Sequence, residues 1–373
     1  MPDTPRTLLM LFFGDTATDR RTQNFRKFFE QSGWNVELLA VTTTATRGPR
    51  KFLEYHRNLA EAVRTKYADV VFACDLYSLS AAAWLKRHKR AQFLIYDARE
   101  VYTELPTVAK KPIAKFIWRT LERHGLAIAD IIITTGPHDI QAICDVHRFL
   151  PRPVLVRNLP WYNPNLTSDR SLLDCFGIPR EASVFVYVGG LQEGRGLKKL
   201  VQALERGDGE VESKQPHILL IGDGILKAEL EDLTQKLGLT KRVHFAGAIP
   251  SEEAIRLAAA CDVGVSLIEP ISRSYELALP SKLFEYMMAG IPVMSSKLQQ
   301  VIELFENERW ITFVDVVDPV LIQEGMDKAL ANSTSELRQV ERGLAHKEFH
   351  FEQDAAVLVE AMEGISKTLP YST

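Results

Sequence analysis

The sequence predicts an α/β protein with two doubly wound domains, each built around a parallel sheet. Strand-length apolar runs recur along the whole chain without polar alternation, as in strands that are buried on both faces. Helical segments separate these runs, which is the pattern of a parallel sheet. The chain has 373 residues and no short internal repeat, so it is long enough for two such domains.

The first half contains six expected strands. They cover residues 7–13, 36–41, 69–73, 93–97, 128–135 and 154–156. Gly14 ends the first strand, and a glycine in a strand-to-helix turn lets the backbone approach a ligand closely. No G-x-G-x-x-G motif follows, so the fingerprint of a dinucleotide site is absent. In such domains we expect the site at the carboxyl ends of the strands.

The second half repeats this pattern. Its expected strands cover residues 184–188, 217–221, 243–248 and 263–267, and a last one begins at 291–294. A polar linker with Pro164 spans residues 161–170. We therefore expect an N-terminal domain over 1–163 and a second domain over 164–351.

Composition places the chain among ordinary globular proteins, with 46% hydrophobic and 25% charged residues. The N-terminal stretch lacks the features of a signal peptide, and no apolar run reaches the length of a membrane span. The four cysteines are scattered, which predicts buried free thiols in a reducing compartment. We expect a cytoplasmic protein, with a peripheral position at the inner face of the membrane as one option.

The net charge of −3 hides an asymmetry between the halves. Residues 1–166 carry 24 Lys and Arg against 16 Asp and Glu, a balance of +8. Residues 167–373 carry 21 against 32, a balance of −11. A basic half and an acidic half predict different partners for the two domains.

The segment 280–294 is the most informative stretch of the chain. Pro280 fits the first turn of a helix, and Gly290 with Pro292 beyond it predicts where that helix ends. The amides and the positive dipole end of a helix N-terminus suit a phosphate, and Lys282 adds a full charge there. Glu285 lies one turn further, where it can accept bonds from two ribose hydroxyls. The alternative is a core helix with a satisfied glutamate.

A glycine-rich turn follows the expected strand 184–188. Its glycines let the backbone approach a diphosphate, and the guanidinium of Arg195 can hold two of its oxygens. The alternative is a surface arginine in a flexible loop.

These motifs carry a resemblance to a known family. P-S-K-L-F-E-Y-M-M-A-G-I-P-V at 280–293 resembles the signature of the group 1 (family 4) glycosyltransferases. V-R-N-L-P, V-Y-V-G-G-L-x-x-G-R-G-L, I-G-D-G and V-x-F-x-G-x-I-P occur ahead of it in the order seen in that family. The resemblance implies the GT-B fold, in which two Rossmann-like domains face each other across a cleft and the second holds a nucleotide-sugar. It also implies a retaining transferase that moves a sugar from a nucleotide-diphosphate sugar to an acceptor hydroxyl, in glycan, glycolipid or polysaccharide biosynthesis.

The resemblance also implies roles for individual residues. Glu285 matches the glutamate that binds the ribose, and Arg195 matches the diphosphate-binding cation. The expected catalytic residues are Arg99, Glu100, Arg195 and Lys282. The expected donor-binding residues are Gly14, Gly190, Arg195, Gly247, Ala248, Pro280, Ser281, Lys282, Leu283 and Glu285. Further contacts to the donor sugar are expected from His138, Arg273, Tyr275 and Glu276.

Two positions depart from the family pattern. Leu277 stands where the signature often has a first glutamate, and D-A-R-E at 97–100 has Arg99 where the family motif has a histidine. Arg99 can counter charge on a departing diphosphate, or it can form an ion pair that fixes a strand end. Because of these departures, a non-catalytic sugar-nucleotide-binding subunit stays open as an alternative. A GT-B sugar-nucleotide epimerase, which would share the fold but need no acceptor, is a second alternative.

No metal-ligand cluster or D-x-D motif lies near the glycine-rich turns, so we expect metal-independent phosphate binding and no cofactor. Two basic segments, 84–90 and 110–123, can lie on anionic lipid. An apolar stripe that packs inward is the alternative for these helices. Nucleic acid is not an expected partner, because the patches lack the aromatic pattern of a known RNA module.

The C-terminal segment, about 352–373, carries apolar residues at helical spacing. Such a helix must bury its apolar face. The resemblance implies that it crosses back and completes the N-terminal domain. A helix that covers only the second domain is the alternative.

Overall fold

A computed structural model describes residues 6–14, 19–44, 48–147, 153–205 and 215–366. The chain divides into two compact units. The first unit holds the chain up to Asn158 and again from Phe351, and the second holds Leu159–His350. The chain thus leaves the first unit five residues before the expected boundary after residue 163. The last part of the expected C-terminal helix, 367–373, lies outside the described residues.

The first unit contains a six-stranded parallel sheet in the order β2-β1-β3-β4-β5-β6. Its strands are β1 (Thr7–Phe13), β2 (Asn35–Val41), β3 (Ala68–Ala73), β4 (Ala91–Ala98), β5 (Ile131–Thr134) and β6 (Val154–Leu155). Its helices are α1 (Arg20–Gln31), α2 (Gly48–Val63), α3 (Leu76–Arg87), η1 (Tyr102–Glu104), α4 (Pro112–Leu126), α5 (Pro137–Val146) and α14 (Phe351–Ser366).

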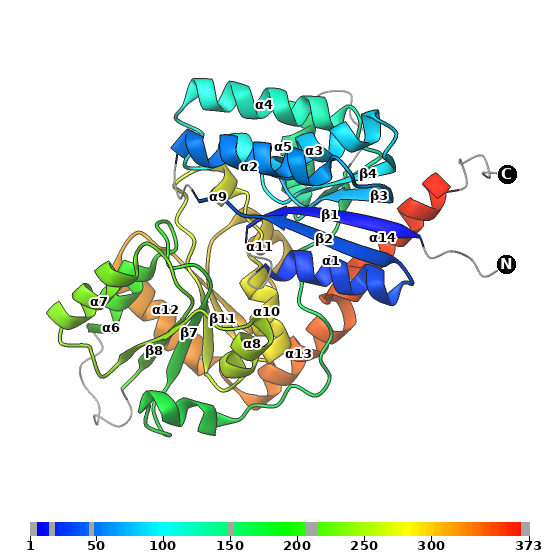
Figure 1. Ribbon diagram of the computed structural model, residues 1–373. Helices are drawn as coiled ribbons and strands as arrows, with labels where there is room; N and C mark the ends of the chain where they lie inside the picture. Colours follow the sequence, from blue (N-terminus) through cyan, green and yellow to red (C-terminus); the bar gives the residue numbers. More distant parts are fainter. Residues whose placement is uncertain (1–5, 15–18, 45–47, 148–152, 206–214, 367–373) are drawn as a thin grey trace. The chain divides into compact units, whose positions relative to one another are not determined.

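Helices cover both faces of this sheet. Figure 1 shows α2, α3 and α4 over one face and α1 with α14 along the other. The apolar core under α2 and α3 includes Tyr55, Leu59 and Leu79, all fully enclosed. Because both faces are covered, β1 shows the continuous burial that its unbroken apolar sequence predicts.

Helix α14 belongs to the first unit through specific contacts. The ring of Phe351 is fully buried and meets the rings of Phe25 and Phe28 on α1, with centroids 5.2 and 6.2 Å apart. Asp354 accepts hydrogen bonds from the backbone N–H and the guanidinium of Arg157, directly after β6. These contacts place the start of the C-terminal helix on the first unit.

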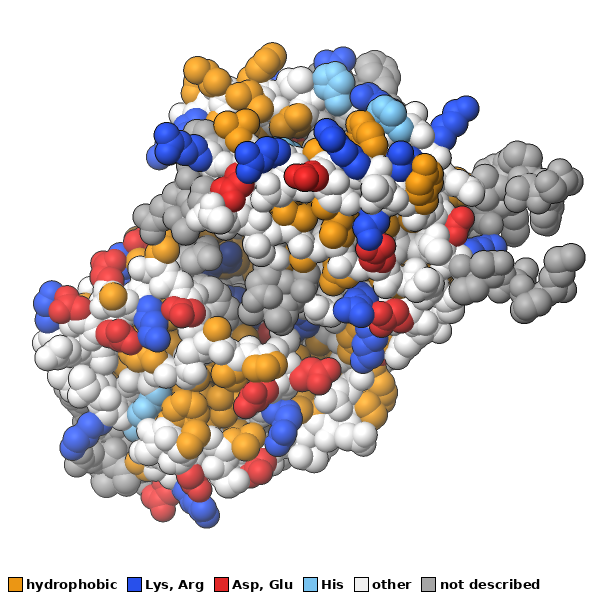
Figure 2. Space-filling model, viewed as in Figure 1, with side chains coloured by type: hydrophobic (Ala, Val, Ile, Leu, Met, Phe, Trp, Pro, Cys, Tyr) orange, Lys and Arg blue, Asp and Glu red, His pale blue; other side chains and the backbone are white. Residues whose placement is uncertain are grey.

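One surface of the first unit is both apolar and basic. Figure 2 shows hydrophobic side chains along the top of this view, over α4, with Lys and Arg side chains beside them. Ile113 and Phe116 on α4 are 77% and 71% exposed. The alternative reading of segment 110–123, in which its whole apolar stripe packs inward, is therefore wrong.

The second unit contains another six-stranded parallel sheet, in the order β12-β11-β10-β7-β8-β9. Its strands are β7 (Val184–Val188), β8 (His217–Ile221), β9 (Val243–Gly247), β10 (Val263–Ser266), β11 (Val293–Ser296) and β12 (Ile311–Val314). Its helical elements are η2 (Arg170–Phe176), α6 (Leu197–Glu205), α7 (Lys227–Lys236), α8 (Ser251–Ala259), α9 (Arg273–Glu276), α10 (Ser281–Ala289), α11 (Gln299–Phe305), α12 (Pro319–Ala331) and α13 (Ser335–Glu348).

In this unit α6, α7 and α12 lie on one side of the sheet, and α8, α10 and α13 lie on the other (Figure 1). The two doubly wound parallel-sheet domains predicted from the sequence are therefore confirmed. The edge strand β12 was not among the expected strands.

The four cysteines are free, as expected. Cys74 and Cys261 are buried, whereas the expectation of burial is wrong for Cys175, which is exposed. None of the helices within the described residues is long and apolar enough to cross a membrane.

Candidate functional site

Three turns meet at the carboxyl edge of the second sheet. The Gly189 N–H after β7 donates to the Ile221 carbonyl at 2.9 Å, and the Gly222 N–H after β8 donates to the Gly247 carbonyl at 2.8 Å. A Cβ on Gly222 would lie 2.0 Å from the Gly189 carbonyl oxygen, so only glycine allows this approach. The backbone of the I-G-D-G segment, 221–224, therefore packs directly against the glycine-rich turn.

The glycine-rich turn presents Arg195 beside an aromatic ring. Its guanidinium lies over the ring of Tyr275, 4.7 Å from the centroid. Gly194 has a φ of +77°, and a Cβ there would come within 2.7 Å of the Tyr275 ring. The turn and the residues around it line a hollow of about 130 Å³. The structure therefore brings together Arg195 and Tyr275, two of the predicted site residues.

Helix α10 points its N-terminus at the same edge. Pro280 is the N-cap, with extended backbone at ψ 124°, and no side chain caps the helix. The expectation that Pro280 lies in the first helical turn is off by one residue, because the helix begins at Ser281. Leu283 is fully buried in the body of the helix. Without a capping side chain, the first amides of α10 remain available to an anion.

Lys282 is a buried cation at this N-terminus. The residue is 8% exposed, and its Nζ lies 3.8 Å from the centroid of the Tyr187 ring. No described residue accepts a hydrogen bond from this ammonium group. Burial lowers the pKa of Lys282 well below its usual value, the nearby charge of Arg195 lowers it further, and Glu285 opposes both effects.

Glu285 lies one helical turn beyond the amides. The residue is 3% exposed, and its Oε1 accepts a hydrogen bond from the Ser281 hydroxyl at 3.3 Å. A buried carboxylate accepts hydrogen bonds and donates none, so it suits a ligand with hydroxyl groups.

Tyr286 fixes α10 against the sheet. Its hydroxyl accepts a hydrogen bond from the Val188 N–H at 3.0 Å and donates to the Val265 carbonyl at 3.2 Å. These two strands, β7 and β10, are neighbours in the sheet. The tyrosine therefore sets the position of Lys282 and Glu285 relative to the turn after β7.

The other residues predicted to contact the donor lie around the glycine-rich turn and the start of α10. Gly247 ends β9 with a φ of +73°, and Ala248 after it is exposed. Arg273 and Glu276 are exposed on the short helix α9. Tyr275 of this helix lies against the glycine-rich turn.

In the first unit Arg99 belongs to an ion-pair network. Its Nη1 donates to Asp19 at 2.7 Å, and its Nε donates to Asp97 at 3.2 Å. Asp97 is fully buried and also accepts two hydrogen bonds from Arg21. Of the two roles considered for Arg99, these contacts favour the ion pair that fixes the end of β4.

The remaining first-unit candidates lie in turns at the carboxyl ends of strands. Gly14 follows β1 with a φ of +132°. Glu100 is exposed after β4, and His138 is half-buried in the first turn of α5. Beside them Asp139 is buried, and burial with the charge of Glu100 raises its pKa to about 7, against a hydrogen bond from Thr135. A carboxyl with this pKa can gain or lose a proton near neutral pH.

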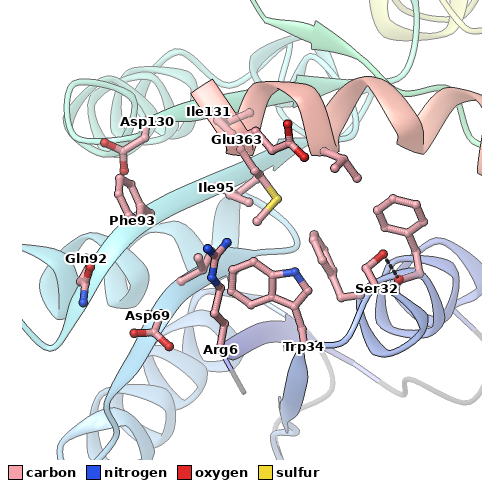
Figure 3. Close-up of a pocket in the computed structure, with 15 residues that line it drawn as sticks. Arg6, Ser32, Trp34, Asp69, Gln92, Phe93, Ile95, Asp130, Ile131 and Glu363 are labelled. Atoms are coloured by element: carbon pink, nitrogen blue, oxygen red, sulfur yellow. Dashed lines mark hydrogen bonds between the residues drawn. The ribbon is translucent and has the colours of Figure 1, made fainter. Parts of the chain in front are cut away.

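A larger cavity lies at the opposite edge of the first sheet. Figure 3 shows Arg6 and Trp34 within it, near the starts of β1 and β2, together with Glu363 of α14. Its volume is about 290 Å³. The cavity is at the amino ends of the strands, whereas ligands of open α/β sheets bind at the carboxyl ends. We therefore do not assign it to the candidate site.

Among the described residues there is no group of three or more His, Cys, Asp or Glu side chains that could hold a metal ion. The positive charge of the second-unit site comes from Lys282, Arg195 and the amides of α10.

Comparison with known proteins agrees with this geometry. The family model for "Glycosyl transferases group 1" matches residues 174–345, which include the glycine-rich turn and α10. This segment, 172 of the 373 residues, is similar to the domain that the model describes. It covers the sheet of the second unit from β7 to β12.

Several proteins are similar to the chain as a whole or in part. The D-inositol 3-phosphate glycosyltransferase of Corynebacterium diphtheriae is 25% identical over 222 residues, which are 57% of this chain and 50% of that protein. The chain thus spans about half the length of this curated relative. Sucrose-phosphate synthase of Thermosynechococcus elongatus superposes with a TM-score of 0.76 at 19% identity, over 98% of this chain and all of that one.

HepE from Anabaena, solved with UDP and glucose, superposes with a TM-score of 0.73 at 18% identity, over 96% of this chain and all of that one. At these identities the likeness shows the fold, and the predicted GT-B fold class is confirmed.

Two residues near the glycosyltransferase motifs were not predicted. The ring of Tyr187 contacts the ammonium of Lys282. The sequence feature that could have indicated this residue is an aromatic side chain near the end of a strand, just before the glycine-rich turn. Asp139 lies next to the predicted His138, but its burial could not be read from the sequence.

Proposed function

We propose that this protein is a glycosyltransferase that moves a sugar from a nucleotide-diphosphate sugar to an acceptor hydroxyl. The observation that carries the proposal is the buried ammonium of Lys282, which lies over an aromatic ring and donates no hydrogen bond to a described residue. A buried charge without a hydrogen-bonded partner is costly, and a diphosphate can supply that partner. The uncapped start of α10 and the guanidinium of Arg195 favour the same ligand.

The residues of the second unit have separate roles in this proposal. Arg195, Lys282 and the first amides of α10 hold the diphosphate and stabilise the charge that it gains as it departs. Glu285 accepts hydrogen bonds from the ribose hydroxyls of the nucleotide. Gly190, Gly247 and Ala248 line the base and diphosphate through their backbone, and Tyr275 holds Arg195 in place.

The reaction exchanges one bond at the sugar. The bond between the anomeric carbon and the diphosphate oxygen breaks, and a bond from the anomeric carbon to the acceptor oxygen forms. The proton of the acceptor hydroxyl passes to the departing diphosphate. We propose that the configuration of the sugar is retained and that no metal or cofactor takes part. The acceptor we propose is a hydroxyl of a glycan or of a lipid-linked sugar.

The test is binding of nucleotides to the full chain. Uridine diphosphate is the first ligand to use, because the similar Anabaena protein was solved with it. We expect Lys282→Ala and Glu285→Ala each to weaken binding by about tenfold or more, since each removes a buried charged partner of the ligand. Isothermal titration calorimetry with the uridine, guanosine and adenosine diphosphates would measure the effect.

The matched control is Lys236→Ala, which removes a lysine on the surface of α7. It should leave nucleotide affinity unchanged. Thermal unfolding without ligand checks that the site variants still fold. If no diphosphate binds the wild-type chain, or if both site variants bind as tightly as wild type, the assignment fails.

A binding protein without transferase activity is the second candidate. It is favoured by the ion pairs of Arg99, which engage a proposed catalytic side chain with two carboxylates. Such a protein would bind the nucleotide-sugar but show neither transfer nor slow hydrolysis of the donor. Detection of free sugar from a bound donor would exclude it.

A further inference from the structure

Helix α4 carries a stripe of apolar side chains that no described residue covers. Ile113, Phe116, Ile117 and Leu121 are 77%, 71%, 49% and 41% exposed. Their spacing of three and four residues places them on one face of the helix. Figure 2 shows this face as a group of hydrophobic side chains on the surface of the first unit.

The opposite face of α4 already packs against the unit. The ring of Trp118 meets the rings of Phe52 and Tyr77, with centroids 5.5 and 5.0 Å apart. A Cβ on Gly125 would lie 2.3 Å from Leu79, so this helix approaches α3 as closely as glycine permits. The fold therefore does not need the outer stripe, and its exposure calls for another partner.

The exposed charges of α4 and of the two residues before it have one sign. Glu122 is the only acidic residue in α4, and it is buried, with hydrogen bonds to Tyr96 and His147. Lys115 pairs with Glu104. The exposed charges that remain are those of Lys110, Lys111, Arg119 and Arg123, none of which pairs with an acid among the described residues.

We propose that α4 docks the protein on a membrane surface that contains anionic lipids. The stripe enters the boundary between headgroups and acyl chains, and the four cations contact headgroup phosphates. Charge complementarity favours this partner, because α4 offers exposed cations and its one acid, Glu122, is buried. A lipid surface also accepts a single convex helix without needing a complementary groove.

The second basic segment of the sequence, 84–90, differs from α4. Lys86 forms an ion pair with Asp130, and Arg90 stacks over Tyr67 and Trp84. Its exposed residues, Arg87, His88 and Lys89, bring no large apolar side chain to the surface. The structure thus assigns membrane docking to α4 and not to this segment.

The experiment is flotation of the full chain with vesicles. One set is pure phosphatidylcholine, and the other contains about 30 mol% phosphatidylglycerol, each at about 50 and about 500 mM NaCl. We expect binding to the anionic vesicles at low salt and much less at high salt. The double variant Phe116→Ser/Ile117→Ser should lower the partition coefficient by about tenfold or more. Lys110→Ala/Lys111→Ala should lower it by roughly fivefold for each cation removed.

Two controls match these variants. Val317→Ser/Val340→Ser removes two exposed apolar side chains of the second unit, 73% and 47% exposed, and should leave binding unchanged. Arg87→Ala/Lys89→Ala removes two cations outside α4 and should have a smaller effect than Lys110→Ala/Lys111→Ala. If Phe116→Ser/Ile117→Ser does not fold, Ile113→Ser alone tests the stripe.

Three results of the flotation experiment would overturn the proposal. They are no binding to anionic vesicles at low salt, unchanged binding by the stripe variant, and loss of binding only in Arg87→Ala/Lys89→Ala. A dimer in sedimentation equilibrium that disappears in the stripe variant would also overturn it, since the stripe would then be a contact between two copies. Nucleotide binding is measured separately and does not affect these outcomes.

Discussion

Two cations, the half-buried Arg99 and the buried Lys282, differ in what surrounds them. Arg99 meets the carboxylates of Asp19 and Asp97, so its charge is compensated within the protein. Lys282 meets the ring of Tyr187, and a cation–π contact contributes about 2 kcal/mol when desolvated. Burial of a charge costs several kcal/mol, so the ring compensates only part of that cost. This difference separates a structural cation from one that is available to a ligand.

The lowered pKa of Lys282 predicts a pH dependence of diphosphate binding. Burial lowers the pKa in the free protein, and a bound diphosphate raises it because opposite charges favour the protonated form. The bound state therefore holds more protons than the free state between these two pKa values. Affinity should fall by about tenfold per pH unit as the pH rises through this window.

Calorimetry in buffers of different ionisation enthalpy would measure the proton uptake. The control is Lys282→Arg, whose guanidinium stays charged, so binding should take up no proton. An absence of proton uptake by the wild type, or the same pH slope in Lys282→Arg, would contradict this account.

At the scale of the element, α10 depends on a close approach to β10. A Cβ on Gly264 would lie 2.3 Å from Cγ of Tyr286, so the glycine makes room for the ring that fixes the helix. The hydroxyl of the same ring bridges β7 and β10. A displaced ring would move Lys282 and Glu285 together, because all three residues belong to one helix.

We therefore predict that Gly264→Ala destabilises the protein and weakens nucleotide binding. Overpacking of a buried contact costs about 1–3 kcal/mol, and this overlap is with a ring that cannot swing away freely. Urea unfolding and nucleotide titration would measure both effects. Gly343→Ala is the matched control, because a Cβ there meets nothing within 4 Å and lies within α13. It should stabilise by roughly 0.5–1 kcal/mol. Equal stability of the two variants would refute the steric argument.

At the scale of the molecule, the chain closes its first unit with its last helix. Phe351 fills a site between α1 side chains, and Asp354 ties the helix to Arg157 after β6. The second unit, Leu159–His350, is thus inserted within the sequence of the first. A defect in α14 should therefore affect the first unit, although α14 follows the second in sequence.

Phe351→Ala tests this connection. Removal of a fully buried phenylalanine costs about 3–5 kcal/mol, and we expect the loss of stability in the first unit. Hydrogen exchange should speed up in peptides from α1 and β6 while nucleotide binding by the second unit persists. Val357→Ala, at a position 48% exposed on the same helix, should change little. Faster exchange confined to Leu159–His350 would show that α14 stabilises the second unit and would contradict the prediction.

Much of the fold could be predicted because local patterns decide it. The expected strands 184–188 and 217–221 match β7 and β8 to the residue. Each is a continuous apolar run, and the turn residues on either side of it set where the strand begins and ends. The end of α10 at Gly290 was also predicted, because its φ of +67° favours glycine. The start of α10 was predicted to within one residue, because Pro280 favours the beginning of a helix.

The partners of the charged residues could not be predicted. Arg99 and Asp19 are 80 residues apart in sequence, and nothing local indicates that they meet. The sequence showed that 110–123 mixes apolar and basic residues, but not that α4 has both a packed face and an uncovered one. The direction of a side chain relative to its neighbours is set by tertiary packing.

The sequence by itself determined the fold class, the approximate ranges of most strands and the place of the glycine-rich turn and α10, because these follow from periodicity and from backbone conformations that few residues adopt. Only the tertiary structure decided that Tyr187 lies under Lys282, that Arg99 is bound by two carboxylates, and that the stripe of α4 faces outward. The physical reason is that burial and charge pairing depend on which segments, far apart in sequence, come into contact. A local sequence pattern carries no information about those contacts.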